Sequence, residues 1–175
     1  MDEFNHSAAD HANNTNLSLV RLCLQNGNPK KALYYCQLLL AKNPNNINVL
    51  LFAAIAARAM GDMNDAYQYA DYATKIAPEN PAPHSLLGDI LLIQKKSQAA
   101  LEKLLHSESL GDRSPQNLFN IGSAYLDLER FKEAKTKLDD ALAINPAMAA
   151  AYVNKGLAEH SLMNLESAID CFDLA

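Results

Sequence analysis

The sequence predicts an all-α fold, a right-handed α-solenoid of about five helical hairpins in which the last hairpin is truncated. Small residues support this prediction, because two series of them recur at an interval of 34 residues. Helix-ending pairs recur with the same interval, as Asn43-Pro44 and Asn145-Pro146 illustrate. The first series is Val20, Ala54, Gly88, Gly122 and Gly156, in which only Val20 departs from a small residue, and the second is Ala32, Ala66, Ala100, Ala134 and Ala168.

The repeated units begin near residues 13, 47, 81, 115 and 149. Each unit divides into two amphipathic segments of about a dozen residues, which predicts two helices joined by a short turn. Residues 1–12 are expected to form a polar N-terminal tail, and residues 13–175 the repeat domain.

Helix starts and turns carry recognisable signals. Ser114 is placed to cap the first helix of the fourth unit, with Pro115 at the first helical position, where its missing N–H costs nothing. Asn28 and Pro29 do the same for the second helix of the first unit. Gly27 and Gly61 precede second helices, where a residue in the left-handed conformation lets the chain reverse.

The small residues have a packing explanation. Two helices that cross closely leave no room for side chains at the point of nearest approach, so Gly122 and Ala134 are expected to meet there. Larger residues should fill the space around this contact, namely Leu118, Ile121, Tyr125 and Leu138.

The pattern resembles the tetratricopeptide repeat family. It has the family's period, Gly or Ala at the eighth place, an aromatic at the eleventh, Ala at the twentieth and near the twenty-seventh, and Pro at the thirty-second. The resemblance covers residues 13–175. It implies stacked hairpins whose first helices line a concave face, and a function in binding segments of other proteins.

Positions 2, 5, 9 and 12 of each first helix, with their neighbours 6 and 13, should face this groove. The segment "INVLLFAAIAARAM" is hydrophobic nearly all round, which for an exposed helix indicates a contact. In the alternative interpretation, some of these residues pack only against the neighbouring first helix, Leu51 and Leu92 in particular. The partner-binding residues we expect are Leu51, Phe52, Ile55, Arg58, Leu86, Asp89, Ile93, Phe119, Asn120, Ser123, Asn154 and Leu157.

The expected partner is an apolar or amphipathic protein segment. Some tetratricopeptide proteins bind the acidic C-termini of heat-shock chaperones through a clamp that begins with Lys at position 5. That position holds no lysine in any unit here, so we exclude an acidic chaperone C-terminus as the partner. Position 5 is occupied by Leu17, Leu51, Ser85, Phe119 and Val153.

Charge and hydropathy exclude other partners. The net charge is −5, with no run of Lys or Arg that could follow a phosphate backbone, so no nucleic acid is expected. No window approaches eighteen apolar residues, so no membrane insertion is expected. The N-terminal residues lack a signal-peptide pattern, which predicts a cytoplasmic protein.

The sequence offers no catalytic, metal or cofactor site. Cys23, Cys36 and Cys171 occupy core positions, and His6, Asp10 and His11 are weighed as metal ligands and set aside because they lie in the unpatterned tail. No nucleophile with a base and no Gly-rich phosphate loop appears, so no enzyme activity is expected. The charges of the fourth unit's second helix are predicted to form four-apart surface pairs, Glu133 with Lys137 and Lys135 with Asp139.

Three functions remain open. The first is an adaptor that binds a partner's peptide or helix in its groove. The second is an N-terminal recruitment domain of a larger protein, such as a glycosyl- or sulfotransferase, since residue 175 falls in the middle of a second helix. The third is a self-associating scaffold, a homo-oligomer in which a second copy covers the last hairpin's apolar flank.

Overall fold

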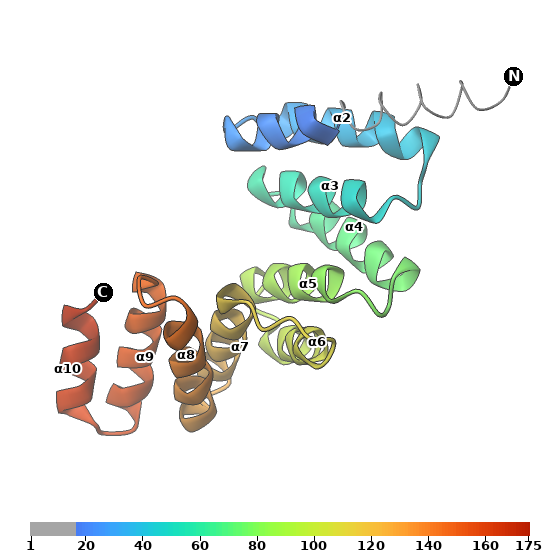
Figure 1. Ribbon diagram of the computed structural model, residues 1–175. Helices are drawn as coiled ribbons and strands as arrows, with labels where there is room; N and C mark the ends of the chain where they lie inside the picture. Colours follow the sequence, from blue (N-terminus) through green and yellow to red (C-terminus); the bar gives the residue numbers. More distant parts are fainter. Residues whose placement is uncertain (1–16) are drawn as a thin grey trace, which may run out of the picture. The chain divides into compact units, whose positions relative to one another are not determined.

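The computed structural model describes residues 17–175, and every regular element among them is a helix (Figure 1). The polar tail, the start of the first unit and the His6, Asp10 and His11 group lie outside the described residues. Residues 17–25 are helical. They are followed by α2 (Pro29–Lys42), α3 (Ile47–Ala59), α4 (Met63–Ile76), α5 (Pro81–Ile93), α6 (Ser97–Ser109), α7 (Pro115–Asp127), α8 (Phe131–Ile144), α9 (Ala149–Ser161) and α10 (Leu165–Asp173).

The helix starts repeat with the interval seen in the sequence. First helices α3, α5, α7 and α9 begin at residues 47, 81, 115 and 149, and second helices α2, α4, α6, α8 and α10 begin at 29, 63, 97, 131 and 165. Each first helix packs against the second helix that follows it. The predicted all-α solenoid of helical repeats is therefore confirmed.

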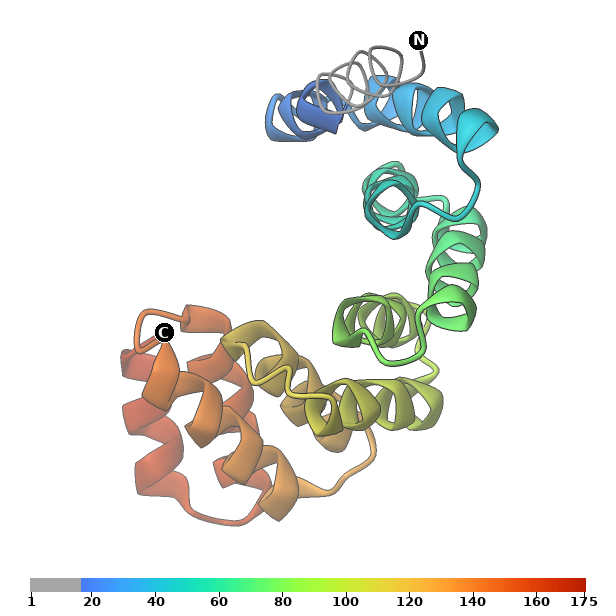
Figure 2. The same cartoon turned by 45° about the vertical axis from the view of Figure 1, so that its right-hand side comes forward.

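The helices group into two compact units (Figure 2). The first unit ends at Pro78 and contains α2, α3 and α4, and the second runs from Glu79 to Ala175 and contains α5 to α10. Within the second unit, α7 packs against α6 and α9 packs against α8, so each hairpin covers the one before it. A single repeat domain over residues 13–175 stays a prediction.

Aliphatic and small side chains form the core of both units, as expected from a sequence rich in Ala and Leu. In the first unit, Ala53 and Ala56 of α3 share one buried cluster with Cys36 and Leu39 of α2. In the second unit, the largest fully buried side chains include Leu87, Ile90, Leu104, Ile121 and Leu138.

The small residue at Gly122 is required by a close approach, but its nearest neighbour differs from the expected one. A Cβ atom at Gly122 would lie 2.7 Å from Cγ of Leu138 and 3.4 Å from the carbonyl oxygen of Ala134. The large side chain of Leu138 therefore fills the space that the glycine leaves, while Ala134 contributes its backbone. Leu118, Ile121, Tyr125 and Leu138 are all buried, as predicted.

The predicted caps and turns are confirmed. Ser114 accepts a hydrogen bond from the N–H of Asn117 (3.3 Å), and Asn28 accepts one from the N–H of Lys31 (3.2 Å). Gly27 and Gly61 have φ angles of +66° and +82°. The same place in the other three turns is also left-handed, although it holds residues with side chains: Lys95, Glu129 and Met163, at φ of 59°, 57° and 64°.

Replacing Glu129 by Gly is expected to raise the free energy of unfolding by about 1 kcal/mol, since a side chain in the left-handed region is strained and glycine is not. Urea unfolding followed by circular dichroism measures the change. Glu129→Ala serves as the matched control, because it removes the same carboxylate and keeps the strained Cβ. An equal gain in both variants would assign the effect to charge rather than to backbone strain.

Candidate functional site, a hollow on the first helices of the second unit

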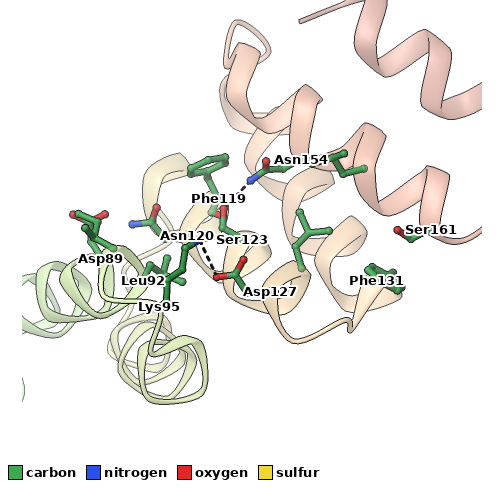
Figure 3. A pocket seen from close by; sticks show the side chains of 13 residues that line it. Asp89, Leu92, Lys95, Phe119, Asn120, Ser123, Asp127, Phe131, Asn154 and Ser161 are labelled. Atoms are coloured by element: carbon green, nitrogen blue, oxygen red, sulfur yellow. Dashed lines mark hydrogen bonds and ion pairs between the residues drawn. The ribbon is translucent and has the colours of Figure 1, made fainter.

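The second unit carries a hollow of about 610 Å³ between α5, α7 and α9 (Figure 3). Side chains from these three first helices, from the turn at Lys95 and from the start of α8 form its walls. They are Asp89, Leu92, Ile93, Lys95, Phe119, Asn120, Ser123, Leu126, Asp127, Phe131, Asn154, Leu157 and Ser161.

Apolar side chains supply much of the wall. Ile93 at the end of α5 is 48% exposed and Leu157 on α9 is 49% exposed, although both are aliphatic. Phe119 also lines the hollow and is half-buried; it belongs to α7, the first helix between α5 and α9 in chain order. These side chains project from the side of the first helices that does not pack on the second helices, so helical periodicity places them in the hollow. The hollow therefore offers apolar surface that a ligand can cover.

Amide and hydroxyl groups on α7 and α9 are joined to one another. Asn154 donates from Nδ2 to the Ser123 hydroxyl (2.9 Å), and that hydroxyl donates to the carbonyl oxygen of Phe119 (2.9 Å), as drawn in part in Figure 3. Asn120 accepts a hydrogen bond from Gln116 (3.0 Å) and is only 4% exposed. Asn120 thus presents less of its amide to a ligand than its sequence position predicts.

Charged groups also line the hollow. Asp127 accepts a hydrogen bond from the Ser97 hydroxyl (2.8 Å), and its carboxylate lies 3.9 Å from Nζ of Lys95. The Lys95 side chain is 82% exposed, so solvent screens this ion pair strongly. Asp89 adds a second carboxylate. The lining therefore holds two carboxylates and one ammonium group.

The structure gathers seven of the twelve predicted partner-binding residues in this hollow: Asp89, Ile93, Phe119, Asn120, Ser123, Asn154 and Leu157. Leu86 is half-buried on α5 and does not line it. The other four, Leu51, Phe52, Ile55 and Arg58, lie half-buried on α3 in the first unit.

On α3, packing accounts for part of what the sequence suggested as binding surface. Phe52 packs against the core of the first unit, and the guanidinium of Arg21 lies 5.5 Å from its ring centre. Burial also lowers the pKa of Arg58. The hydrophobic character of α3 thus serves the interior of the first unit at least at Phe52.

Several residues of the hollow were missed by the sequence analysis. Leu126 and Ser161 stand at positions 12 and 13 of their 34-residue repeats, so the rule for groove-facing positions includes them. Lys95 and Phe131 belong to a turn and to the start of a second helix. A rule confined to first helices has no means of finding them.

The cysteines behave as core residues. Burial raises the pKa of Cys36 to about 12, and burial is also the main cause that raises the pKa of Cys171. Neither thiol is therefore activated as a nucleophile. Among residues 17–175, no three His, Cys, Asp or Glu side chains gather as metal ligands would. No helix in that range has the length and apolar character needed to cross a membrane.

Family models described as tetratricopeptide repeat match residues 23–90 and residues 119–175, which together make up more than half of the chain. The protein belongs to the tetratricopeptide repeat family. This confirms the resemblance drawn from the 34-residue period.

Solved structures with the same fold include MamA from Desulfovibrio magneticus RS-1, at 21% identity and a TM-score of 0.79, covering 91% of this chain and 90% of that one. YrrB, a tetratricopeptide protein with an unusual peptide-binding site, has 18% identity and a TM-score of 0.72, with coverages of 91% and 82%. TTC0263, a tetratricopeptide protein of Thermus thermophilus, has 18% identity and a TM-score of 0.76, with coverages of 91% and 88%. No curated protein matches. At these identities, the likeness establishes the fold.

Proposed function

We propose that this protein is a non-catalytic scaffold that binds an apolar or amphipathic segment of a partner protein in the hollow of its second unit. The observation that carries the proposal is the exposed aliphatic surface of Ile93 and Leu157 beside Phe119, in a hollow of about 610 Å³. Pockets that bind ligands are lined mostly by apolar side chains with a few polar groups among them, and this lining has that composition.

The polar groups favour a peptide over a small apolar molecule. Ser123 and Asn154 stand on neighbouring first helices and are bonded to each other, so both are held in place. Amide and hydroxyl groups of this kind can exchange hydrogen bonds with the backbone of a bound segment. Fixed groups make such bonds at a lower entropy cost than mobile ones.

The charges oppose an acidic ligand. The lining contains Asp89 and Asp127 against a single lysine, Lys95. Lys95 is the one cationic residue of this lining and lies near Asp127, so a terminal carboxylate or an acidic tail meets no cationic clamp in the hollow. The same balance disfavours nucleic acid. YrrB, which shares the fold, is described as having a peptide-binding site, and this agrees with the proposal in kind.

The test begins with affinity capture from a lysate, followed by titration of synthetic segments of each captured protein by fluorescence anisotropy. The variant Ile93→Asp, Leu157→Asp places charges in the apolar wall. We expect it to bind the segment at least tenfold more weakly, because each buried aliphatic side chain contributes roughly 1.5–3 kcal/mol.

The matched control is Ile144→Asp, since Ile144 is 55% exposed and lies on α8 outside the hollow. It should bind like the unmodified protein. Equal affinity in all three proteins would reject the hollow as the binding site. Loss of binding in the Ile144 variant alone would move the site to α8.

A further inference from the structure

The first and the last described hairpins expose large apolar side chains at places where the equivalent side chains of the hairpins between them are buried. Leu22, in the helix 17–25, is 51% exposed, while its equivalents Ala56, Ala124 and Ala158 are 0% exposed. At the other end, Phe172 of α10 is 43% exposed, while its equivalents Cys36, Leu104 and Leu138 are 0% exposed. Among the described helices, α10 packs against α9 alone (Figure 1).

The interior of the chain shows what covers these faces. In the first unit, α3 packs against the preceding second helix α2, and Ala53 and Ala56 of α3 share one buried cluster with Cys36 and Leu39 of α2. In the second unit, α7 covers α6 and α9 covers α8 in the same order. A first helix seated on the preceding second helix is thus the packing unit of this fold. Helix α10 is a second helix, so its exposed face is the kind that a first helix covers elsewhere in the fold. Residues 17–25 form a first helix, so their exposed face is the kind that packs on a second helix.

The two exposed faces are both apolar at the positions where the interface between α8 and α9 has an ion pair. Between α8 and α9, Nζ of Lys135 lies 3.2 Å from the carboxylate of Glu159. The residue equivalent to Lys135 on α10 is Ile169, which is 60% exposed, and the residue equivalent to Glu159 in the first hairpin is Cys23. Both charges are replaced by apolar groups, one at each end of the chain.

The receiving face is also hollowed. A depression of about 170 Å³ lies on the first hairpin, and its lining includes Leu19 and Leu22, the equivalents of Ala53 and Ala56, which are buried in one cluster with residues of α2. A branched aliphatic side chain such as Ile169 can enter a space of this size. The lining residues are Leu19, Leu22, Cys23, Asn26, Asn28, Lys31 and Tyr35.

Charge selects the same pairing. The described part of the first hairpin, residues 17–42, contains no Asp or Glu, and its charged residues are Arg21, Lys30, Lys31 and Lys42. Helix α10 contains no Lys or Arg, and its charged residues are Glu166, Asp170 and Asp173, all exposed. Segments of opposite charge attract each other on approach, and they disfavour the alternatives in which two like segments meet.

We infer that a second copy of this chain docks head to tail, with its helix 17–25 seated on α10 of the first copy. Such a contact joins two different faces, so it leaves one free face at each end of the dimer and allows further copies to add. The interface is separate from the hollow proposed to bind a partner segment, and it does not depend on that function.

Sedimentation velocity over a concentration series tests this inference. The unmodified protein should grow in mass beyond a dimer as concentration rises, and less so at high salt because the opposite charges are screened. Leu22→Glu and Ile169→Glu should each remain monomeric, since each places a carboxylate on one face. An equimolar mixture of these two variants should form a dimer and stop there, because only one pair of intact faces remains.

Ile144→Glu is the control for adding a carboxylate at an exposed aliphatic site, and it should associate like the unmodified protein. Circular dichroism checks that each variant keeps its helices. The inference is overturned if the unmodified protein stays monomeric into the millimolar range, which would leave these faces to other occupants. It is also overturned if either single variant still associates, or if the mixture stays monomeric.

Discussion

Replacing Leu138 by Ala should lower the free energy of unfolding by roughly 3 kcal/mol, because the side chain is fully buried and fills a space that nothing else occupies. Replacing Gly122 by Ala should cost roughly 1–3 kcal/mol for the opposite reason. The added Cβ would lie 2.7 Å from Cγ and 3.0 Å from Cδ2 of Leu138, so one of the two helices must shift.

In the double variant, the loss in the free energy of unfolding is expected to be smaller than the sum of the two single losses by about 1 kcal/mol or more. A coupling of this size is found between residues in contact. Leu138→Ala removes the very atoms that the new methyl group would strike, so Gly122→Ala becomes nearly harmless in that background. Urea unfolding followed by circular dichroism supplies all four free energies. Simple additivity would show that Gly122 is small for some reason other than Leu138.

The pairing of Gly122 with Leu138 explains a regularity that the sequence shows without its cause. Gly88 faces Leu104 and Gly156 faces Phe172 in the same way, since a Cβ at either glycine would lie 2.5 Å from the side chain opposite. In the first two 34-residue repeats, the equivalent pairs are Val20 with Cys36 and Ala54 with Ala70. At the three glycines, the missing Cβ leaves room for the large side chain on the facing helix.

Helix positions were predictable because they depend on local signals and on the period. The groove residues were less so, because their grouping depends on how neighbouring helices are placed. The sequence rule put Leu86 and Asp89 on one face, yet only Asp89 lines the hollow. The sequence rule treated each first helix in isolation, whereas the hollow is bounded by three first helices, the turn at Lys95 and the start of α8.

The surface charges show the same limit. The predicted pair of Lys135 with Asp139 is confirmed, at 3.2 Å. The predicted pair of Glu133 with Lys137 is wrong, because Lys137 binds Glu108 of α6 at 2.5 Å and Glu133 binds Arg130 at 2.8 Å. Spacing along one helix identifies candidate ion-pair partners on that helix. It cannot identify a carboxylate on another helix nearly thirty residues earlier, as Glu108 is for Lys137.

Asn117 is a further residue whose role only the structure reveals. It stands at the third place of its 34-residue repeat, and its side chain is fully buried. The equivalent residues of other repeats, Val49, Pro83 and Ala151, are apolar. Its Nδ2 donates to the carbonyl oxygens of Asp112 (2.9 Å) and Leu104 (3.4 Å). Its Oδ1 accepts a hydrogen bond from the Ser85 hydroxyl (3.2 Å). One amide thus joins α5, α6, the following turn and α7.

Replacing Asn117 by Leu is expected to lower the free energy of unfolding by roughly 2–4 kcal/mol, because it leaves buried carbonyl groups and a hydroxyl without this partner. Asn117→Asp keeps the shape but turns a carboxylate toward the carbonyl oxygen of Asp112, so it should be at least as harmful. Ser85→Ala is the mild control, since it removes one half-buried hydroxyl and should cost under about 1 kcal/mol. Urea unfolding ranks the three. If Asn117→Leu were as stable as the unmodified protein, apolar packing alone would hold this turn, as it does at Val49 and Ala151.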